Sequence, residues 1–129
     1  MSDAIELVQR FCAEWGKGAH VETIIGYFTD DAVYHNIPVD PPAVGKDAIR
    51  GVFAMFTTGA ESIEFRVDNI AAAGDTVLTE RVDSFVLPHT RIELPVMGTF
   101  EVRDGKIAAW RDYFDLNQYM TQLQAGAGS

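Results

Sequence analysis

The sequence contains only one cysteine, Cys12, so no disulfide can form within the chain. No apolar run approaches the ~18 residues that are needed to span a bilayer. The first residues, MSDAIELVQRF, lack the basic and then apolar pattern of a secretory signal. These absences predict a cytoplasmic protein with no membrane partner, because a fold without disulfides suits a reducing compartment.

Basic residues are also scarce, and this excludes a further class of partner. The chain has 10 Lys and Arg residues against 19 Asp and Glu residues, which gives a net charge of −9. No cluster of basic residues is present, and binding to a phosphate backbone depends on many positive contacts. We therefore expect no nucleic-acid partner.

The sequence lacks the usual signatures of metal, cofactor and covalent chemistry. His20, His35 and His89 do not have metal-ligand spacing, and no glycine-rich phosphate loop follows a predicted strand. No Ser or Cys stands beside an identifiable His–acid pair. Cys12 is expected in the core, because it lies on the apolar face of a predicted helix. We therefore expect no cofactor, and chemistry on a bound water remains the candidate.

The 129 residues suit one domain, which we place at residues 1–123, followed by a flexible tail rich in Gly, Ala and Ser at 124–129. Apolar spacings of three and four residues predict helices over 5–15, 21–27, 46–56 and 116–123. Alternating runs predict strands over 32–37, 62–72, 76–87, 91–103 and 106–115, with a constrained loop at 38–45. Helices followed by long antiparallel strands predict an α+β domain, with helices on one face of a bent sheet and a cone-shaped pocket between them.

One face of the predicted strands combines charged and large apolar side chains. Asp112 shares a face with Trp110 and Phe114, and Arg81 shares a face with Asp83. A buried carboxylate needs a partner, and the fork of donors on Arg81 can bind two carboxylates. A single Arg–Asp pair is more often a structural ion pair. Two aspartates that share one arginine favour acid–base chemistry, because they separate each other's proton affinities.

Tyr34 and Asn36 share a face of the predicted strand at 32–37, whereas His35 points to the other side. A phenol and an amide can together hold one water molecule. A buried polar pair that satisfies its own hydrogen bonds is an equally good interpretation of these two residues taken alone.

Three segments carry a family resemblance, namely VYHNIP (33–38), TERVDSF (79–85) and AAWRDYFDL (108–116). In their order and separation the sequence resembles the limonene-1,2-epoxide hydrolase family, over nearly the whole chain to Leu116. Residues 87–94 depart from the family pattern, because Pro88-His89-Thr90-Arg91 stands where a glycine-containing turn is expected.

The resemblance implies a fold and a reaction. The implied fold is a cystatin-like cone: a curved, mixed but mostly antiparallel sheet with helices capping a deep pocket, commonly in a homodimer. By resemblance, Asp112 is the base that takes a proton from water, and Tyr34 and Asn36 help to hold that water. Asp83 would protonate the epoxide oxygen, and Arg81 would bridge the two aspartates. The implied reaction turns an epoxide into a vicinal diol in one step without a covalent intermediate.

An apolar pocket is expected beside these polar groups, and it implies a terpene-like or cyclic epoxide as the substrate. The candidate wall residues are Trp15, Phe53, Phe56, Phe85, Leu94, Val96, Trp110 and Phe114. Two alternatives remain at this point. The same cone could carry a ketosteroid-isomerase-like or polyketide-cyclase-like enzyme, or a non-catalytic module that binds small molecules.

Overall fold

A computed structural model describes residues 3–127 of the chain, which form one six-stranded sheet and four helices. The helices are α1 (Asp3–Trp15), α2 (Val21–Ile25), α3 (Lys46–Gly59) and α4 (Leu116–Ala127). The strands are β1 (Phe28–Asn36), β2 (Ala43–Val44), β3 (Ser62–Ala73), β4 (Thr76–Val86), β5 (Arg91–Arg103) and β6 (Lys106–Tyr113). No helix among residues 3–127 is long and apolar enough to cross a membrane.

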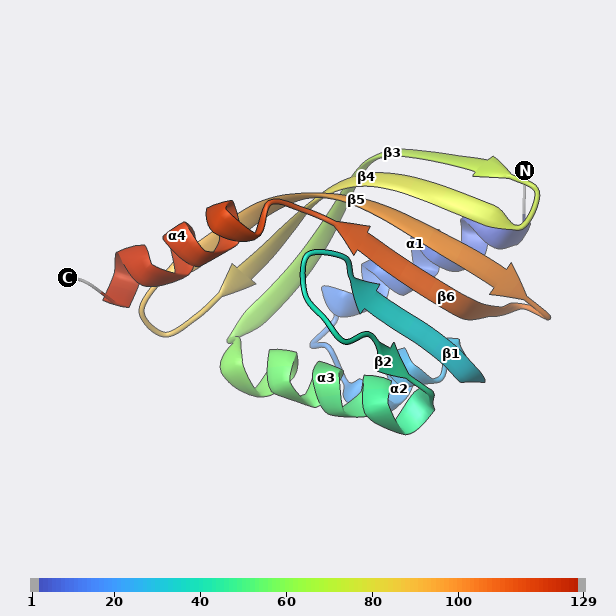
Figure 1. The fold of residues 1–129 in the computed structure, drawn as a ribbon, viewed down its shortest axis with the longest axis horizontal. Coiled ribbons are helices and arrows are strands. Elements are labelled where there is room, and N and C mark those ends of the chain that lie inside the picture. The colour runs from blue at the N-terminus through green and yellow to red at the C-terminus, as the bar shows by residue number, and fades with distance from the viewer. Residues whose placement is uncertain (1–2, 128–129) are drawn as a thin grey trace.

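The strand order across the sheet is β2-β1-β6-β5-β4-β3. Only the β1–β6 pair is parallel within the described chain, and the other neighbours are antiparallel. Figure 1 shows a strongly curved sheet, with α1 lying against one face and α3 running beside β1 and β2 toward the start of β3. The predicted α+β class, with a curved, mixed and mostly antiparallel sheet, is confirmed.

The core forms where the apolar stripe of α1 meets the inner face of the sheet. Leu7, Phe11 and Trp15 follow one another at four-residue steps, Val8 lies on the same helix face, and all four are buried. Phe11 is fully buried and contacts five other aromatic rings edge-on, including Trp110 with ring centroids 5.0 Å apart. This packed aromatic layer supports the strands on which the polar residues stand.

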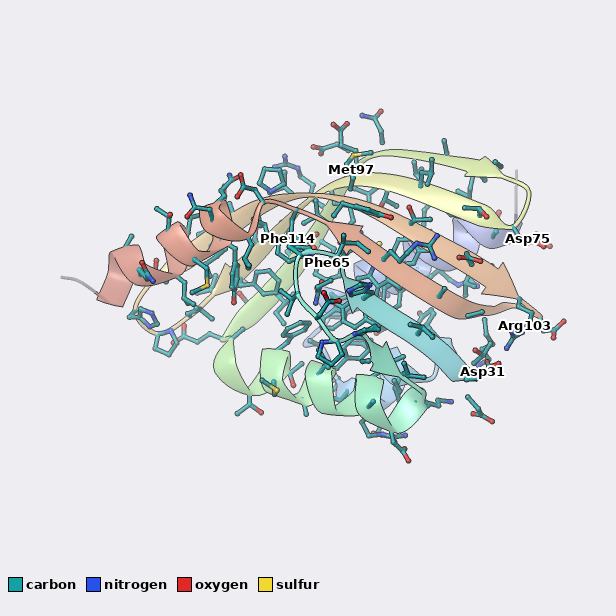
Figure 2. The ribbon with its side chains drawn as sticks, in the orientation of Figure 1. Asp31, Phe65, Asp75, Met97, Arg103 and Phe114 are labelled. Carbon is teal, nitrogen blue, oxygen red and sulfur yellow. The ribbon has the colours of Figure 1, made fainter. Side chains whose placement is uncertain are left out.

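The start of the first strand was predicted too late. The predicted strand began at residue 32, but β1 begins at Phe28 and continues through Asp30 and Asp31. The two side chains are exposed, and Asp31 accepts hydrogen bonds from Thr29 and Arg103, so their charge remains solvated. Figure 2 shows Asp31 and Arg103 side by side at the end of the sheet. The pairing of β1 with β6 is irregular between Phe28 and Val33.

Other boundaries differ by a few residues. The predicted loop at 38–45 contains the short strand β2, which pairs with Val33 and Tyr34. Helix α2 ends at Ile25 and not at the predicted residue 27, and β6 ends at Tyr113 and not at 115. Helix α3 continues to Gly59, past the predicted end at 56. Helix α4 continues to Ala127, so the predicted end at 123 was too early and part of the expected tail is helical. Residues 128–129 lie outside the described part of the chain.

Candidate active site

The register of four strands places the polar residues in one row across the inner face of the sheet. Thr79 on β4 pairs with Gly98 on β5, Gly98 pairs with Asp112 on β6, and Asp112 pairs with Asn36 on β1. Arg81 and Asp83 follow Thr79 at two-residue steps, and therefore share its face. Residues that are far apart in sequence thus meet above one region of the sheet.

Arg81 holds both aspartates with a single guanidinium group. Its Nε donates to Asp83 Oδ1 at 3.0 Å, and its Nη2 donates to Asp83 Oδ2 at 2.7 Å. The same Nη2 donates to Asp112 Oδ2 at 2.8 Å, and Nη1 donates to Asp112 Oδ1 at 3.2 Å. The side chain of Arg81 has no exposed surface, and each aspartate side chain is 5% exposed. The arginine predicted to bridge the two carboxylates therefore contacts both of them.

Burial and the neighbouring charges shift the pKa values of Asp83 and Arg81. Burial raises the pKa of Asp83 to about 6, against the opposing charge and hydrogen bonds of Arg81. Burial alone would lower the pKa of Arg81, but the two aspartates outweigh it and raise this pKa well above its ordinary value. Arg81 therefore stays charged, and Asp83 can carry a proton near neutral pH.

Asp112 has one donor more than Asp83. The indole Nε1 of Trp110 donates to Asp112 Oδ1 at 2.6 Å, in addition to the two bonds from Arg81. Three donors stabilise the ionised form of a carboxylate. The two aspartates therefore lie in different surroundings, although both contact the same arginine.

Tyr34 and Asn36 lie beside Asp112 and contact each other. The Tyr34 hydroxyl donates to Asn36 Oδ1 at 3.1 Å, and this bond leaves the amide nitrogen of Asn36 free to donate elsewhere. Burial raises the pKa of Tyr34 well above its ordinary value, and the nearby Asp112 raises it further. The phenol therefore keeps its proton and remains a hydrogen-bond donor.

A cavity of about 430 Å³ opens in front of these groups. Asp83, Asp112, Tyr34 and Asn36 stand on its wall, and the rest of the wall is mostly apolar. Phe56, Phe85, Leu94, Val96 and Phe114, which we predicted as wall residues, all line it. Figure 2 marks Phe65 and Phe114, which lie on the wall at the inner side of the sheet.

Three predicted wall residues do not line this cavity. Trp15, Phe53 and Trp110 are 1%, 0% and 0% exposed and belong to the aromatic core beneath it. They face inward as predicted, but they pack against one another and not against the cavity. Further residues line the wall that were not predicted, namely Val39, Met55, Gly59, Ala60, Phe65, Leu87, Ile92, Leu116 and Tyr119.

Other candidate groups do not line the cavity. Cys12 is buried, and burial raises its thiol pKa to about 12, so it stays protonated in the core as expected. His35 contacts Val39 and Asp40, and His89 is exposed. Among residues 3–127, no group of three or more His, Cys, Asp or Glu side chains is arranged to hold a metal ion.

Comparisons with known proteins agree with this geometry. The family model described as the limonene-1,2-epoxide hydrolase catalytic domain matches residues 2–125. The chain belongs to the limonene-1,2-epoxide hydrolase family. The curated protein epoxide hydrolase EphG of Mycobacterium tuberculosis is 36% identical over 110 residues, which cover 81% of this chain and 69% of EphG. Membership of the limonene-1,2-epoxide hydrolase family favours an epoxide hydrolase over the isomerase-like, cyclase-like and non-catalytic alternatives.

Solved structures support the same fold. An LEH-like epoxide hydrolase from M. tuberculosis superposes with a TM-score of 0.83 at 30% identity, covering 97% of this chain and 92% of that one. A SnoaL-like polyketide cyclase from Shewanella putrefaciens superposes with a TM-score of 0.85 at 14% identity, covering 97% and 98% of the two chains. At 14% identity the second likeness shows the shared cone fold alone.

Proposed function

We propose that this epoxide hydrolase converts a hydrophobic epoxide to a vicinal diol in one step, by acid–base-catalysed attack of water. The observation that carries the proposal is the pair of aspartates on one cavity wall, both buried and both bound to Arg81. Opening an epoxide requires a base for the water and an acid for the ring oxygen. Two carboxylates with different surroundings can supply both.

Asp112 is the base in this proposal, because it accepts three hydrogen bonds that favour its ionised form. A water between Asp112 and Asn36 would donate a proton to the carboxylate and accept a hydrogen bond from the amide of Asn36. The Tyr34 hydroxyl fixes the orientation of that amide. Tyr34 and Asn36 thus orient the attacking oxygen.

Asp83 is the acid, because its raised pKa keeps a proton available for the epoxide oxygen. The water oxygen bonds to one ring carbon, the carbon–oxygen bond of the ring breaks, and the proton of Asp83 completes the second hydroxyl. The water's proton remains on Asp112. It must return to Asp83 before the next turnover, and Arg81 Nη2 contacts both carboxylates.

The cavity wall supports a hydrophobic substrate. Away from the four polar side chains it is built largely from aliphatic and aromatic residues, which favour a terpene-like or cyclic epoxide with little polarity. Placing such a substrate beside the bound water accounts for much of the rate, because orientation replaces a bimolecular encounter. Each positioned acid or base adds roughly 10²–10⁴-fold.

Replacement of the base tests the assignment. Asp112→Asn is expected to fold and to lose at least about 10²-fold in kcat for diol formation, measured by chromatography of the diol. Asp75→Asn is the matched control, because this exposed aspartate lies in the turn between β3 and β4 (Figure 2). Full activity of Asp112→Asn would reject Asp112 as the base.

An isotope experiment tests the single step. In one turnover in oxygen-18 water, the label is expected in the diol and not in the protein, because water attacks the ring directly. Mass spectrometry of the peptides that contain Asp83 and Asp112 provides the measurement. Label in either carboxylate would indicate a covalent ester and contradict the one-step mechanism.

We also propose that the enzyme is a cytoplasmic homodimer that associates through the outer face of the sheet. Leu78, Met97 and Tyr113 are 46%, 50% and 46% exposed, and Met97 pairs directly with Tyr113. Figure 2 shows Met97 on the side of the sheet away from Phe65. Met97→Glu should shift the molecular mass in light scattering from dimer to monomer, whereas Val44→Glu on β2 should not. A monomeric wild type would reject this proposal.

A further inference from the structure

Arg81 has five N–H donors, and the structure accounts for all of them. One from Nε and one from Nη2 bind Asp83, and one from Nη2 and one from Nη1 bind Asp112. The fifth, the second donor of Nη1, binds the hydroxyl oxygen of Thr79 at 3.1 Å. A neutral side chain thus completes the coordination of a buried cation. Without it, one charged donor would have no partner in the core.

The hydroxyl of Thr79 is itself held in place. The residue is 1% exposed, and its hydroxyl donates to the backbone oxygen of Gly98 at 3.3 Å. Because the single proton of the hydroxyl is used in this bond, a lone pair of the oxygen faces Arg81. The threonine is therefore oriented as an acceptor for the guanidinium.

Gly98 provides the space in which the guanidinium lies. It stands between Thr79 and Asp112 in the row across the sheet. A Cβ atom at this position would lie 2.3 Å from Arg81 Nη1, 2.7 Å from Asp112 Oδ1 and 2.9 Å from Thr79 Oγ1. A glycine inside a strand often marks such a close approach. Any larger residue would have to displace the groups that hold Asp112.

The geometry points to Thr79 and Gly98 as positioning residues for the hydrolase reaction, which set the plane of Arg81 so that it reaches both aspartates. Neither residue lines the cavity, so both act through Arg81 and do not contact the substrate. The inference rests on the proposed roles of Asp83 and Asp112. The titratable and charged side chains around this arginine are Asp83 on β4, Asp112 on β6, Tyr34 on β1 and Cys12 on α1.

Replacing Thr79 by an isosteric apolar residue removes the acceptor and keeps the shape. In Thr79→Val, the unpaired Nη1 donor is expected to turn toward the nearest remaining acceptor, Asp112, and to draw the fork away from Asp83. We expect kcat to fall about 10- to 100-fold and KM to change less than about threefold, because positioning affects the transition state. Thr79→Ser keeps the acceptor and should restore most of the activity.

The pH profile separates positioning from simple packing. With less contact to Arg81, the pKa of Asp83 should rise, so the basic limb of kcat/KM should move to higher pH in Thr79→Val and not in Thr79→Ser. Thr76→Val is the matched control, because Thr76 begins the same strand on the opposite face and should behave as the wild type. An unmoved limb in an active, folded Thr79→Val would reject the inference.

Gly98→Ala tests the second residue proposed to position Arg81. Its Cβ should push the guanidinium from Asp112, and we expect a loss of kcat at least as large as that of Thr79→Val, with the thermal unfolding curve still cooperative. If Gly98→Ala is folded and fully active, the proposal that Thr79 and Gly98 position Arg81 is rejected. If the wild type makes no diol from any hydrophobic epoxide, the proposed function fails instead. If Thr79→Val does not fold, the other two variants still test the inference. Folded Thr79→Ser must keep the wild-type pH profile of kcat/KM, and folded Gly98→Ala must lose activity.

Discussion

At the scale of single residues, Asp83 and Asp112 have the same side chain and different surroundings. Asp112 accepts from Trp110 and twice from Arg81, whereas Asp83 accepts only from Arg81. Two carboxylates against one guanidinium leave an excess negative charge in a buried site, unless one carboxylate is protonated. The aspartate with fewer donors, Asp83, is the one whose pKa burial raises to about 6. This difference in donors supports the assignment of acid and base.

The raised pKa of Asp83 predicts how activity depends on pH. The acid must be protonated, and its pKa is about 6, so kcat/KM should fall tenfold per pH unit well above pH 6. The measurement is the initial rate of diol formation at low substrate concentration from pH 4 to 9. A profile that stays flat across this range would show that no group with such a pKa must be protonated.

The sequence was sufficient to place the polar side chains but not to separate the core from the cavity. Side chains alternate along a strand, so Arg81, Asp83 and Asp112 could be assigned to one face. Alternation along β6 placed Trp110 inward, and the apolar face of α1 placed Trp15 inward. Their depth depends on the curvature of the sheet and on the position of α1, which no local pattern reveals. Of the two residues that position Arg81, only Gly98 could have been noticed in the sequence, because a glycine inside a predicted strand often marks a close approach of other groups.

At the scale of elements, the long strands were predicted well because their alternation extends over many residues. The start of β1 was not, because two adjacent aspartates resemble a turn and become strand only through pairing with β6. The strand β2 has two residues and forms through its partner β1, so its own sequence carries little information. Short elements depend on tertiary contacts more than on propensity.

Helix α4 is attached to β5 through the amide of Gln122. Its Nε2 donates to the backbone oxygen of Glu93 at 2.9 Å, and its Oε1 accepts from the backbone nitrogen of Glu93 at 2.8 Å. Strand β6 pairs with β5 only from Met97 onward, so this side of Glu93 has no strand partner. The glutamine supplies the hydrogen bonds that a neighbouring strand would make. It thereby fixes the helix that contributes Leu116 and Tyr119 to the cavity wall.

Removal of this contact should loosen one wall of the cavity. In Gln122→Ala, we expect faster amide exchange in α4 and an increase in KM of roughly 2- to 10-fold with kcat nearly unchanged, because the wall contributes uniform binding. Gln118→Ala, an exposed glutamine on the same helix, is the control. Hydrogen exchange by mass spectrometry and steady-state kinetics measure the two effects. Unchanged exchange in α4 would show that Gln122 does not hold the helix.

At the scale of the whole molecule, the net charge of −9 includes two buried carboxylates, Asp83 and Asp112, and one buried arginine, Arg81. A buried acid whose pKa is raised in the folded state binds its proton more tightly there than in the unfolded chain. Asp83 moves from an ordinary 3.8 to about 6. Its proton therefore stabilises the fold fully below about pH 4, and this contribution is lost as the pH rises through about 6.

Asp83→Asn should remove this pH dependence, because the amide is neutral at every pH. A shift of about two pKa units corresponds to up to about 3 kcal/mol. The free energy of unfolding of Asp83→Asn, taken relative to that of the wild type, should therefore be larger at pH 7.5 than at pH 4.5. The expected difference is about 2 kcal/mol, because pH 4.5 already lies above the unfolded pKa of 3.8. The cost of fitting an amide against the fork of Arg81 is the same at both pH values and cancels in the difference. Urea unfolding of both proteins at the two pH values measures it, and a difference independent of pH would show that Asp83 carries no raised pKa in the folded protein.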